Sequence, residues 1–184
     1  FHETKNIHCG EGGALIINNS DFIERAEIIR QKGTNRSQFL KGVVDKYTWT
    51  DVGSSYLLNE LSSAFLLGQL ESLETNTELR LKLWDRYDSN LKNSKAKFNF
   101  ETFEIPVFNK HNAHIFYIKC KNLDTRDNLI KYLRSKGIES SFHYLPLHKS
   151  KPGKEFGRFE GDDKYTTSGS EGLTRLPLHV SLTI

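Results

Sequence analysis

The sequence predicts an α/β protein, in which short strands and helices alternate along the chain. Three stretches favour this class. An apolar run at residues 14–17 precedes a helical repeat that ends at Gly33. A broad apolar stripe predicts a long helix from about Tyr56 to Asn90. Residues 103–179 then alternate between apolar runs and capped helical repeats, which indicates a small α/β domain.

The composition is that of an ordinary globular domain. The chain has 184 residues, of which 36% are hydrophobic, and this is enough for a sizeable core. Its 26 basic and 23 acidic residues give a net charge of +3, which is too balanced to indicate nucleic-acid binding. No apolar run approaches the roughly 20 residues that a membrane span needs. Neither nucleic acid nor a membrane is therefore expected as a partner.

The cysteines and histidines carry no recognisable pattern. Cys9 and Cys120 have no C-x-x-C spacing, so a disulfide framework is not expected and a reducing cytoplasm is predicted. The seven histidines form neither H-x-x-x-H nor H-E-x-x-H on a clear helix. We therefore predict no metal site.

The first 55 residues are expected to hold one strand and one helix. Residues 14–17 are predicted to form a short buried strand, and Ser20 or Asp21 to cap the following helix, with Glu24 completing a capping box with Asp21. Residues 34–55 are predicted to form a long polar loop. Its aromatic residues Tyr47 and Trp49 either pack against another surface or fold back on their own domain.

The long predicted helix has an unusual length for a single domain. A helix of more than about 25 residues normally bridges domains or packs on another subunit. Residues 71–78 are more polar than their surroundings, which predicts a kink or a break there. Residues 92–102 are polar and mark the boundary to a second unit.

The second unit is predicted to contain three strands and two helices. The expected strands are residues 103–108, 114–120 and 138–142. A helix capped by Asp124 or Thr125 is expected to run to Lys136 and to stop at Gly137. A loop rich in Gly and Lys follows at residues 149–163, and then a short helix at residues 166–175.

The strongest functional signal lies in the first thirteen residues. Lys5 precedes a turn that contains Gly10, Gly12 and Gly13. An unprotonated lysine amine can form a covalent bond with an aldehyde, and glycine lets the backbone approach a bulky ligand. A lysine beside a glycine turn is also a common solvated arrangement. The pattern alone therefore leaves a cofactor lysine and a solvated lysine both open.

The amino-acid sequence of this segment resembles that of a known family. Phe1-His-Glu-Thr-Lys5-Asn, followed by Gly-Glu-Gly-Gly, is similar to the lysine segment of the DegT/DnrJ/EryC1/StrS sugar aminotransferases, Ser-Phe-x-x-x-Lys and then Gly-x-Gly-Gly. The resemblance implies that pyridoxal 5′-phosphate (PLP) is the cofactor and that Lys5 holds it covalently. The family's Ser would precede Phe1, so we expect the chain to be truncated at its N-terminus.

Further segments extend the resemblance over essentially the whole chain. Residues 51–58 are similar to the family's Gly-x-Asn-Tyr-Arg segment, whose Asn reaches the cofactor phosphate of the neighbouring subunit. This chain has Ser55 at the Asn position and Leu57 at the Arg position, and a serine hydroxyl can still donate to phosphate. The other matching motifs are Ala113-His-x-x-Tyr117, Phe142-His-Tyr-x-Pro-Leu-His148 and Leu176-Pro-Leu178.

The resemblance also implies an organisation. The chain is expected to be the C-terminal half of a fold-type I PLP-dependent aminotransferase, which works as a homodimer with its sites at the interface. Residues 1–55 would end the large PLP-binding domain and carry an interface loop. Residues 56–92 would be a long connecting helix, and residues 93–184 a small α/β domain that is truncated at its end. Most other cofactor contacts would lie upstream of Phe1, so the 184 residues alone are expected to be inactive.

One subgroup of the family matches several stretches better, including the Ser-Ser-Tyr-Leu departure at residues 54–57. The reaction that this implies is amino transfer from L-glutamate to the C4 ketone of a dTDP-linked 4-keto-6-deoxy sugar. Arg36 is the candidate for phosphate, because a guanidinium fork matches phosphate oxygens. The remaining substrate candidates are Asn35, Tyr47, His143, Tyr144 and His148. Arg36 could instead be a surface arginine, and either histidine could be satisfied within the small domain.

Three alternatives remain open from the sequence. The protein could act on another nucleotide-linked keto sugar, since pocket residues decide that choice. It could be a non-catalytic relative that serves dehydration or sensing, although such relatives lack the lysine. It could also be a plain α/β binding domain, if the motifs are set aside.

Overall fold

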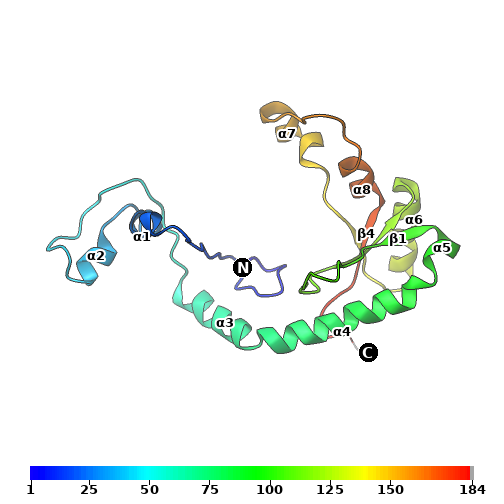
Figure 1. The fold of residues 1–184 in the computed structure, drawn as a ribbon, viewed down its shortest axis with the longest axis horizontal. Coiled ribbons are helices and arrows are strands. Elements are labelled where there is room, and N and C mark those ends of the chain that lie inside the picture. The colour runs from blue at the N-terminus through cyan, green and yellow to red at the C-terminus, as the bar shows by residue number, and fades with distance from the viewer. Residues whose placement is uncertain (183–184) are drawn as a thin grey trace. The chain divides into compact units, whose positions relative to one another are not determined.

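The computed structural model describes residues 1–182 of the chain (Figure 1). The chain divides into two compact units, one spanning Phe1–Leu73 and the other beginning at Glu74. The division falls within the stretch for which one long helix is predicted. Among the described residues, none of the helices has both the length and the apolar character needed to span a lipid bilayer.

The first unit is helical. Its elements are η1 (Ser20–Phe22), α1 (Ile23–Arg30), α2 (Arg36–Leu40) and α3 (Glu60–Glu71). The strand predicted at residues 14–17 is wrong, because these residues belong to no helix or strand, and Leu15 and Ile16 are 77% and 83% exposed. A strand needs a neighbour for its backbone N–H and C=O groups, and no strand is present in residues 1–73 to provide one.

Hydrogen-bonded turns lie on both sides of helix α1. Asn19 caps the short turn η1 that leads into α1, since its Oδ1 accepts a hydrogen bond from the Asp21 amide at 3.0 Å. The N-cap of α1 itself is Phe22, which makes no capping bond, so the capping box predicted from Asp21 is not formed. The predicted stop at Gly33 is confirmed. Gly33 has φ of +73° and donates its N–H to the Ile28 carbonyl at 2.9 Å. A side chain there would also collide with the Asp51 carbonyl, so the turn requires glycine.

The loop predicted at residues 34–55 contains helix α2 and folds back on its own unit. Two isolated antiparallel bridges, Gln31 with Ser55 and Thr34 with Trp49, tie its backbone to the end of α1. The aromatic side chains nevertheless remain largely open, with Tyr47 53% and Trp49 75% exposed. The backbone therefore folds back, while the aromatic side chains do not become buried within the unit.

The predicted long helix is two helices. Helix α3 is followed at Ser72 by a break, and α4 then runs from Leu73 to Lys92, so the predicted interruption is confirmed. Helix α3 starts at Glu60, later than the predicted Tyr56, because Asn59 caps it by accepting from the Ser62 amide at 2.9 Å.

The second unit contains a four-stranded antiparallel sheet in the order β1-β2-β4-β3. Its strands are β1 (Phe100–Thr102), β2 (Phe116–Cys120), β3 (Ser141–Phe142) and β4 (Leu173–Leu176). The other elements are α4, α5 (Lys95–Phe98), α6 (Leu123–Ser135), η2 (Leu147–Lys149), α7 (Lys151–Phe156) and α8 (Thr166–Gly172).

Predictions for this unit are confirmed in part. The strand predicted at residues 114–120 corresponds to β2, and the predicted helix up to Lys136 corresponds to α6, which Asn122 caps. The strand predicted at residues 103–108 is wrong, since β1 lies just before it and Pro106, which lacks an N–H, interrupts the predicted run. The helix predicted at residues 166–175 ends at Gly172, and residues 173–176 form the inner strand β4 instead.

The core of the second unit lies on one face of this sheet. It consists of Trp84, Ala113, Phe116 and Ile118, and the ring of Phe116 lies 5.3 Å from that of Trp84 and 5.0 Å from that of Tyr87. Partly buried residues of α4 and α6 pack against the same cluster. Both helices therefore cover the face of the sheet that carries Phe116.

A partly buried arginine, Arg80, holds the chain as it enters β2. Ala113 is 1% exposed and has φ of +47°, a left-handed conformation that is strained for alanine. Arg80 donates from Nε to the Ala113 carbonyl at 2.9 Å and from Nη2 to the His114 carbonyl at 2.6 Å. Burial lowers the pKa of the Arg80 guanidinium from its ordinary value. These two charge-assisted bonds fix the strained backbone in place.

Replacing Arg80 by alanine should lower the free energy of unfolding by about 2 kcal/mol, because two partly buried carbonyls lose their donors. Urea denaturation monitored by tryptophan fluorescence measures this change. Arg86→Ala, at an exposed position of the same helix, is the matched control and should change stability by less than about 0.5 kcal/mol. Equal effects of the two variants would show that the Arg80 bonds contribute nothing specific.

Candidate active site

The segment that carries Lys5 forms a closed loop. The Lys5 amide donates to the His2 carbonyl and the Cys9 amide to the Phe1 carbonyl, each at 3.0 Å. The ring of His8 lies 5.4 Å from that of Phe65, which attaches the loop to α3. The Lys5 side chain is exposed, and no hydrogen bond or ion pair within residues 1–182 engages its amine. A primary amine is thus held on an ordered loop and left free.

The glycines next to Lys5 leave open space. Gly10 has φ of +83°, and neither Gly10 nor Gly13 has any atom within 4 Å of the position that a Cβ would take. Gly12 differs, since a Cβ there would lie 2.7 Å from Cys9 Sγ. A free amine beside uncrowded backbone suits a planar aldehyde such as pyridoxal phosphate, which needs a primary amine and room for its ring.

Ser55 is held by its backbone. It forms the bridge with Gln31, and its neighbours Ser54 and Tyr56 donate their N–H groups to carbonyls of Ile29 and Arg30 at 3.0 and 3.1 Å. Its side chain is exposed and makes no hydrogen bond within the described part of the chain. The hydroxyl is therefore available to donate to an anion.

Both polar atoms of the Asn35 side chain bond to the backbone of the loop that follows it. It is 7% exposed, its Nδ2 donates to the Lys46 carbonyl at 3.1 Å, and its Oδ1 accepts from the Thr48 amide at 2.7 Å. Arg36, the first residue of α2, is exposed and has no ion-pair partner within residues 1–182. Tyr47 lies 6.5 Å, ring to ring, from Phe39. Asn35 thus positions the loop that presents Arg36 and Tyr47.

His143 and Tyr144 lie together after strand β3. Their rings are 5.3 Å apart, and the Nδ1 atom of His143 is buried without a hydrogen-bond partner among the described residues. Burial lowers the pKa of His143, and the positive charge of Arg175 lowers it further. His143 is therefore neutral at neutral pH, with one ring nitrogen left for a ligand or a water molecule.

His148 lies in η2 and is already paired. Its Nε2 lies 2.8 Å from Asp163 Oδ2, and its ring packs against that of Phe159 at 4.4 Å. Asp163 also accepts hydrogen bonds from the hydroxyl of Thr167 and, at 3.1 Å, from its amide. These bonds, with a smaller contribution from His148, lower the pKa of the Asp163 carboxyl to about 2. His148 thus connects η2 to the start of α8.

The Asp163 contacts should depend on acid pH. Because the pKa of this carboxyl is lower in the folded state than its ordinary 3.8, its stabilising effect is present above that value and is lost as pH falls toward about 2. The Thr167 amide proton shift, followed by NMR from pH 6 to pH 2, should report a midpoint near the lower value. Asp163→Asn should remove this transition, whereas Asp162→Asn should retain it. A Thr167 midpoint close to 4 would contradict the assignment.

The predicted site residues therefore form separate groups. In the first unit, Lys5 lies on the N-terminal loop, Ser55 at the bridge beside α1, and Asn35, Arg36 and Tyr47 on the loop around α2. In the second unit, His143 and Tyr144 are in contact, and His148 is tied to Asp163.

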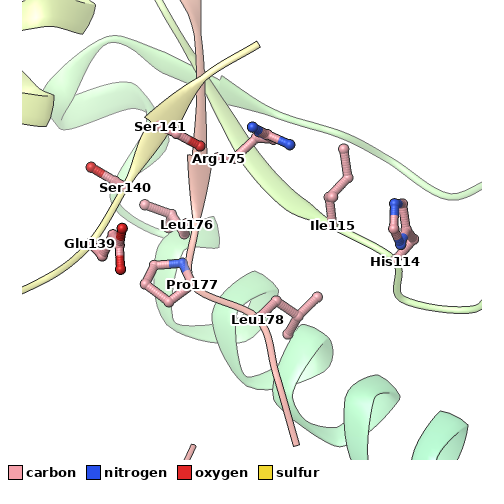
Figure 2. Close-up of a pocket in the computed structure, with 9 residues that line it drawn as sticks. All are labelled: His114, Ile115, Glu139, Ser140, Ser141, Arg175, Leu176, Pro177 and Leu178. Carbon is pink, nitrogen blue, oxygen red and sulfur yellow. The ribbon is translucent and has the colours of Figure 1, made fainter. Parts of the chain in front are cut away.

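The sequence prediction missed Arg175. This residue of β4 lowers the pKa of His143 and lines a cavity of about 260 Å³ (Figure 2). The sequence signal for it is weak, namely one charged residue in the otherwise uncharged stretch 172–178.

Comparison with known proteins identifies the class. The sequence profile of the DegT/DnrJ/EryC1/StrS aminotransferase family matches residues 1–184. A DegT/DnrJ/EryC1/StrS aminotransferase from Brucella abortus is similar in structure, with a TM-score of 0.79 and 26% identity over 100% of this chain and 45% of that chain.

Two further structures share the fold. Spr1654 from Streptococcus pneumoniae, in its PLP form, has a TM-score of 0.73 and 20% identity over 93% of this chain and 42% of that chain. PseC from Helicobacter pylori, an aminotransferase involved in pseudoaminic acid biosynthesis, has a TM-score of 0.76 and 20% identity over 91% of this chain and 43% of that chain.

The fold is therefore that of a PLP-dependent aminotransferase, as predicted, over less than half the length of these solved structures. The free Lys5 amine and the open glycine turn lie in the first thirteen residues of a chain that the profile matches from end to end. The chain belongs to the DegT/DnrJ/EryC1/StrS aminotransferase family, whose aminotransferases use pyridoxal phosphate.

Proposed function

We propose that the complete protein transfers an amino group from L-glutamate to the C4 ketone of dTDP-4-keto-6-deoxy-D-glucose. The product would be dTDP-4-amino-4,6-dideoxy-D-galactose, so the enzyme would be a dTDP-4-amino-4,6-dideoxygalactose transaminase. It would act in the cytoplasm and supply a surface polysaccharide of the enterobacterial common antigen type. The observation that carries the proposal is the exposed, unpartnered Lys5 amine beside the open glycine turn, in a chain that matches the family throughout.

Lys5 has two roles in this proposal. When bound, pyridoxal phosphate supplies an electron sink that stabilises negative charge on the amino-acid Cα. Lys5 Nζ would hold the cofactor when it is bound. When released, the Lys5 amine would move a proton at the Cα of the amino-acid substrate.

Phosphate groups would be bound by the loop after α1. The exposed Ser55 hydroxyl would donate to the cofactor phosphate, and the Arg36 guanidinium to the pyrophosphate of the sugar nucleotide. Asn35, which is buried and fully hydrogen bonded, would act by positioning rather than by touching substrate. The exposed Tyr47 ring would contact the nucleotide.

The second unit would provide the sugar side. His143 and Tyr144 lie in contact, and the unpartnered Nδ1 of His143 is suited to a sugar hydroxyl because the low pKa keeps the ring neutral. His148, held by Asp163, would present only its remaining ring edge.

A homodimer would complete the sites. Helix α3 and the loop around α2 leave large apolar side chains open, with Leu61 86%, Phe65 52% and Trp49 75% exposed. Single exposed apolar residues are common, but several large ones on one small unit are typical of a covered surface. A second copy of the protein would supply that cover.

A structural neighbour supports a second candidate substrate. PseC acts in pseudoaminic acid biosynthesis, so proteins of this fold serve more than one pathway. Another nucleotide-linked keto sugar is therefore the alternative. A non-catalytic role is less well supported, because Lys5 is present and free.

The decisive experiment incubates the complete protein, PLP and L-glutamate with a panel of nucleotide-linked keto sugars. We expect 2-oxoglutarate to accumulate with dTDP-4-keto-6-deoxy-D-glucose, and NMR of the product to show an axial C4 amine. Turnover with a different keto sugar would replace the substrate assignment but retain the reaction. No turnover with any of them would overturn both. The 184-residue chain alone, as the control, is expected to give none.

A further inference from the structure

A row of three polar side chains crosses the sheet of the second unit on the face opposite its core. Tyr117 of β2 lies directly opposite Arg175 of β4, and Arg175 lies directly opposite Ser141 of β3. Residues paired in this way share a face of the sheet. Because side chains alternate along a strand, this is not the face that carries Phe116 and Leu176. Figure 2 shows Arg175 and Leu176 leaving β4 in opposite directions.

Arg175 is a cation without a counter-ion. Within residues 1–182 it makes no ion pair, and its Nε is buried without a hydrogen-bond partner. The guanidinium lies 5.8 Å from the centre of the Tyr144 ring, a contact that leaves its N–H groups without an acceptor. Burial lowers the pKa of His143, and the charge of Arg175 lowers it further. A partly buried guanidinium without an acceptor is costly unless an anion joins it.

The two neighbours of Arg175 in this row are hydroxyls, and neither of them is bonded. The side chains of Tyr117 and Ser141 make no hydrogen bond within the described part of the chain. Burial, and to a smaller extent the charge of Glu101, raises the pKa of the Tyr117 hydroxyl, which therefore stays protonated and can donate. The row thus presents a guanidinium between two hydroxyls, and all three can donate to an anion.

A second cation on this face, Lys119, differs from Arg175. It lies two residues after Tyr117 on β2, and its Nζ is 3.3 Å from Glu101 Oε2 on β1. This positive charge is therefore neutralised within the chain. Arg175 has no such carboxylate among the described residues, and the difference indicates that its acceptor comes from outside them.

We infer that Arg175 binds a carboxylate of the amino donor L-glutamate, with the Tyr117 and Ser141 hydroxyls beside it. The inference rests on the reaction proposed above, in which the amino donor and the keto sugar occupy the same site in turn. His143 and Tyr144, which are assigned there to the sugar, are the residues that Arg175 adjoins. A planar carboxylate matches the parallel N–H groups of a single guanidinium.

The pyrophosphate of the sugar nucleotide is another anion of the proposed reaction, and this row suits it less well. A pyrophosphate carries more negative charge than one guanidinium neutralises. Lys119 is already paired with Glu101, so it does not supply a further free charge on this face. A carboxylate is therefore the ligand that this row favours.

Steady-state kinetics of the complete protein test the assignment. Arg175→Gln should raise the KM for L-glutamate by about tenfold or more, because a charge-assisted bond is lost, and should change the KM for the keto sugar by less than about threefold. Arg175→Lys keeps the charge but loses the fork, so it should recover part of the affinity for glutamate. Lys119→Gln, which removes the same charge from the same face, is the matched control and should leave both KM values unchanged.

Two kinetic results would overturn the inference. A rise in the KM for the keto sugar alone would assign Arg175 to the sugar nucleotide. Equal effects of Arg175→Gln and Lys119→Gln would show that only the net charge of this face matters.

Binding measured without turnover separates this inference from the reaction itself. L-Norvaline has a methyl group in place of the side-chain carboxylate of glutamate, and 4-aminobutyrate lacks the α-carboxylate. Each is titrated into the complete protein, as is L-glutamate, while the side-chain Nε–Hε NMR signal of Arg175 is followed. A shift with L-norvaline would assign the α-carboxylate, and a shift with 4-aminobutyrate the side-chain carboxylate.

No shift of the Arg175 signal with any of the three compounds would refute the carboxylate site. This measurement also decides the outcome if Arg175→Gln fails to fold. A shift with L-glutamate in a protein that shows no turnover would retain the carboxylate site and contradict only the proposed reaction.

Discussion

Replacing Lys5 by alanine in the complete protein is expected to lower the rate of amino transfer by about a thousandfold or more. Proton transfer by a positioned side chain alone contributes about 10²–10⁴-fold. The variant also loses the only group in the glycine-turn segment that can bond covalently to the cofactor. Borohydride reduction in the presence of PLP, followed by peptide mapping, measures that bond directly and should label Lys5 in the unmodified protein.

Lys41→Ala is the matched control for this experiment. Lys41 is also an exposed lysine of the first unit, and its contact with Glu27, at 3.3 Å, is a surface ion pair of small energetic value. Its loss should leave both labelling and turnover unchanged. Label on another lysine, with Lys5 unlabelled, would sink the aminotransferase proposal and favour a non-catalytic relative. Label on Lys5 in the complete protein but not in the 184-residue chain would mean that residues outside this chain complete the pocket.

Phe116→Ala is expected to lower the free energy of unfolding by about 3–5 kcal/mol, the range for removing a buried phenylalanine ring. Phe116 is 2% exposed and touches the rings of both Trp84 and Tyr87, so its loss leaves a cavity between sheet and helix. Urea denaturation of the variant and of the unmodified protein gives the difference.

Phe108→Ala provides the same chemical change outside the core. Phe108 is 84% exposed, and its replacement should change stability by less than about 0.5 kcal/mol. A loss of less than about 1 kcal/mol at Phe116 would contradict its place at the centre of the core.

Local patterns predicted those elements whose partners lie within the chain. Strand β2 was predictable because residues 114–120 form a short, largely apolar run, and α6 because a polar cap precedes a clear helical repeat. Residues 14–17 have an equally apolar pattern but no neighbouring strand within residues 1–73, and they are exposed. An apolar run indicates a tendency to be buried, but it forms a strand only where a neighbouring strand can pair with it.

Strand β4 is the converse case, in which a strand forms where the sequence predicts a helix. The helix predicted at residues 166–175 includes most of β4, yet this strand pairs with β2 on one side and β3 on the other, and Thr174 has no exposed surface. Tertiary pairing overrode local preference here, as is common for strands.

Some residues of the candidate site could likewise be predicted from the sequence, and others could not. Lys5 could be found because a specific run of residues surrounds it. Arg175 could not, because its interest comes from the hydrogen-bond partners that it lacks, and a sequence does not contain that information. Asn35 was predicted to bind substrate, and in the structure its side-chain amide bonds to the backbone of its own loop.

The position of β4 has a consequence for biosynthesis. Strands β2 and β3 do not pair with each other, and β4, which is synthesised after both, lies between them. As the chain leaves the ribosome, α4, β1, β2 and α6 emerge first, and the sheet is still missing its inner strand. Until residues 173–176 emerge, Phe142 and its neighbours have no ladder to join, and the apolar face remains open. Completion of this sheet therefore depends on contacts between residues far apart in the sequence, which slow folding.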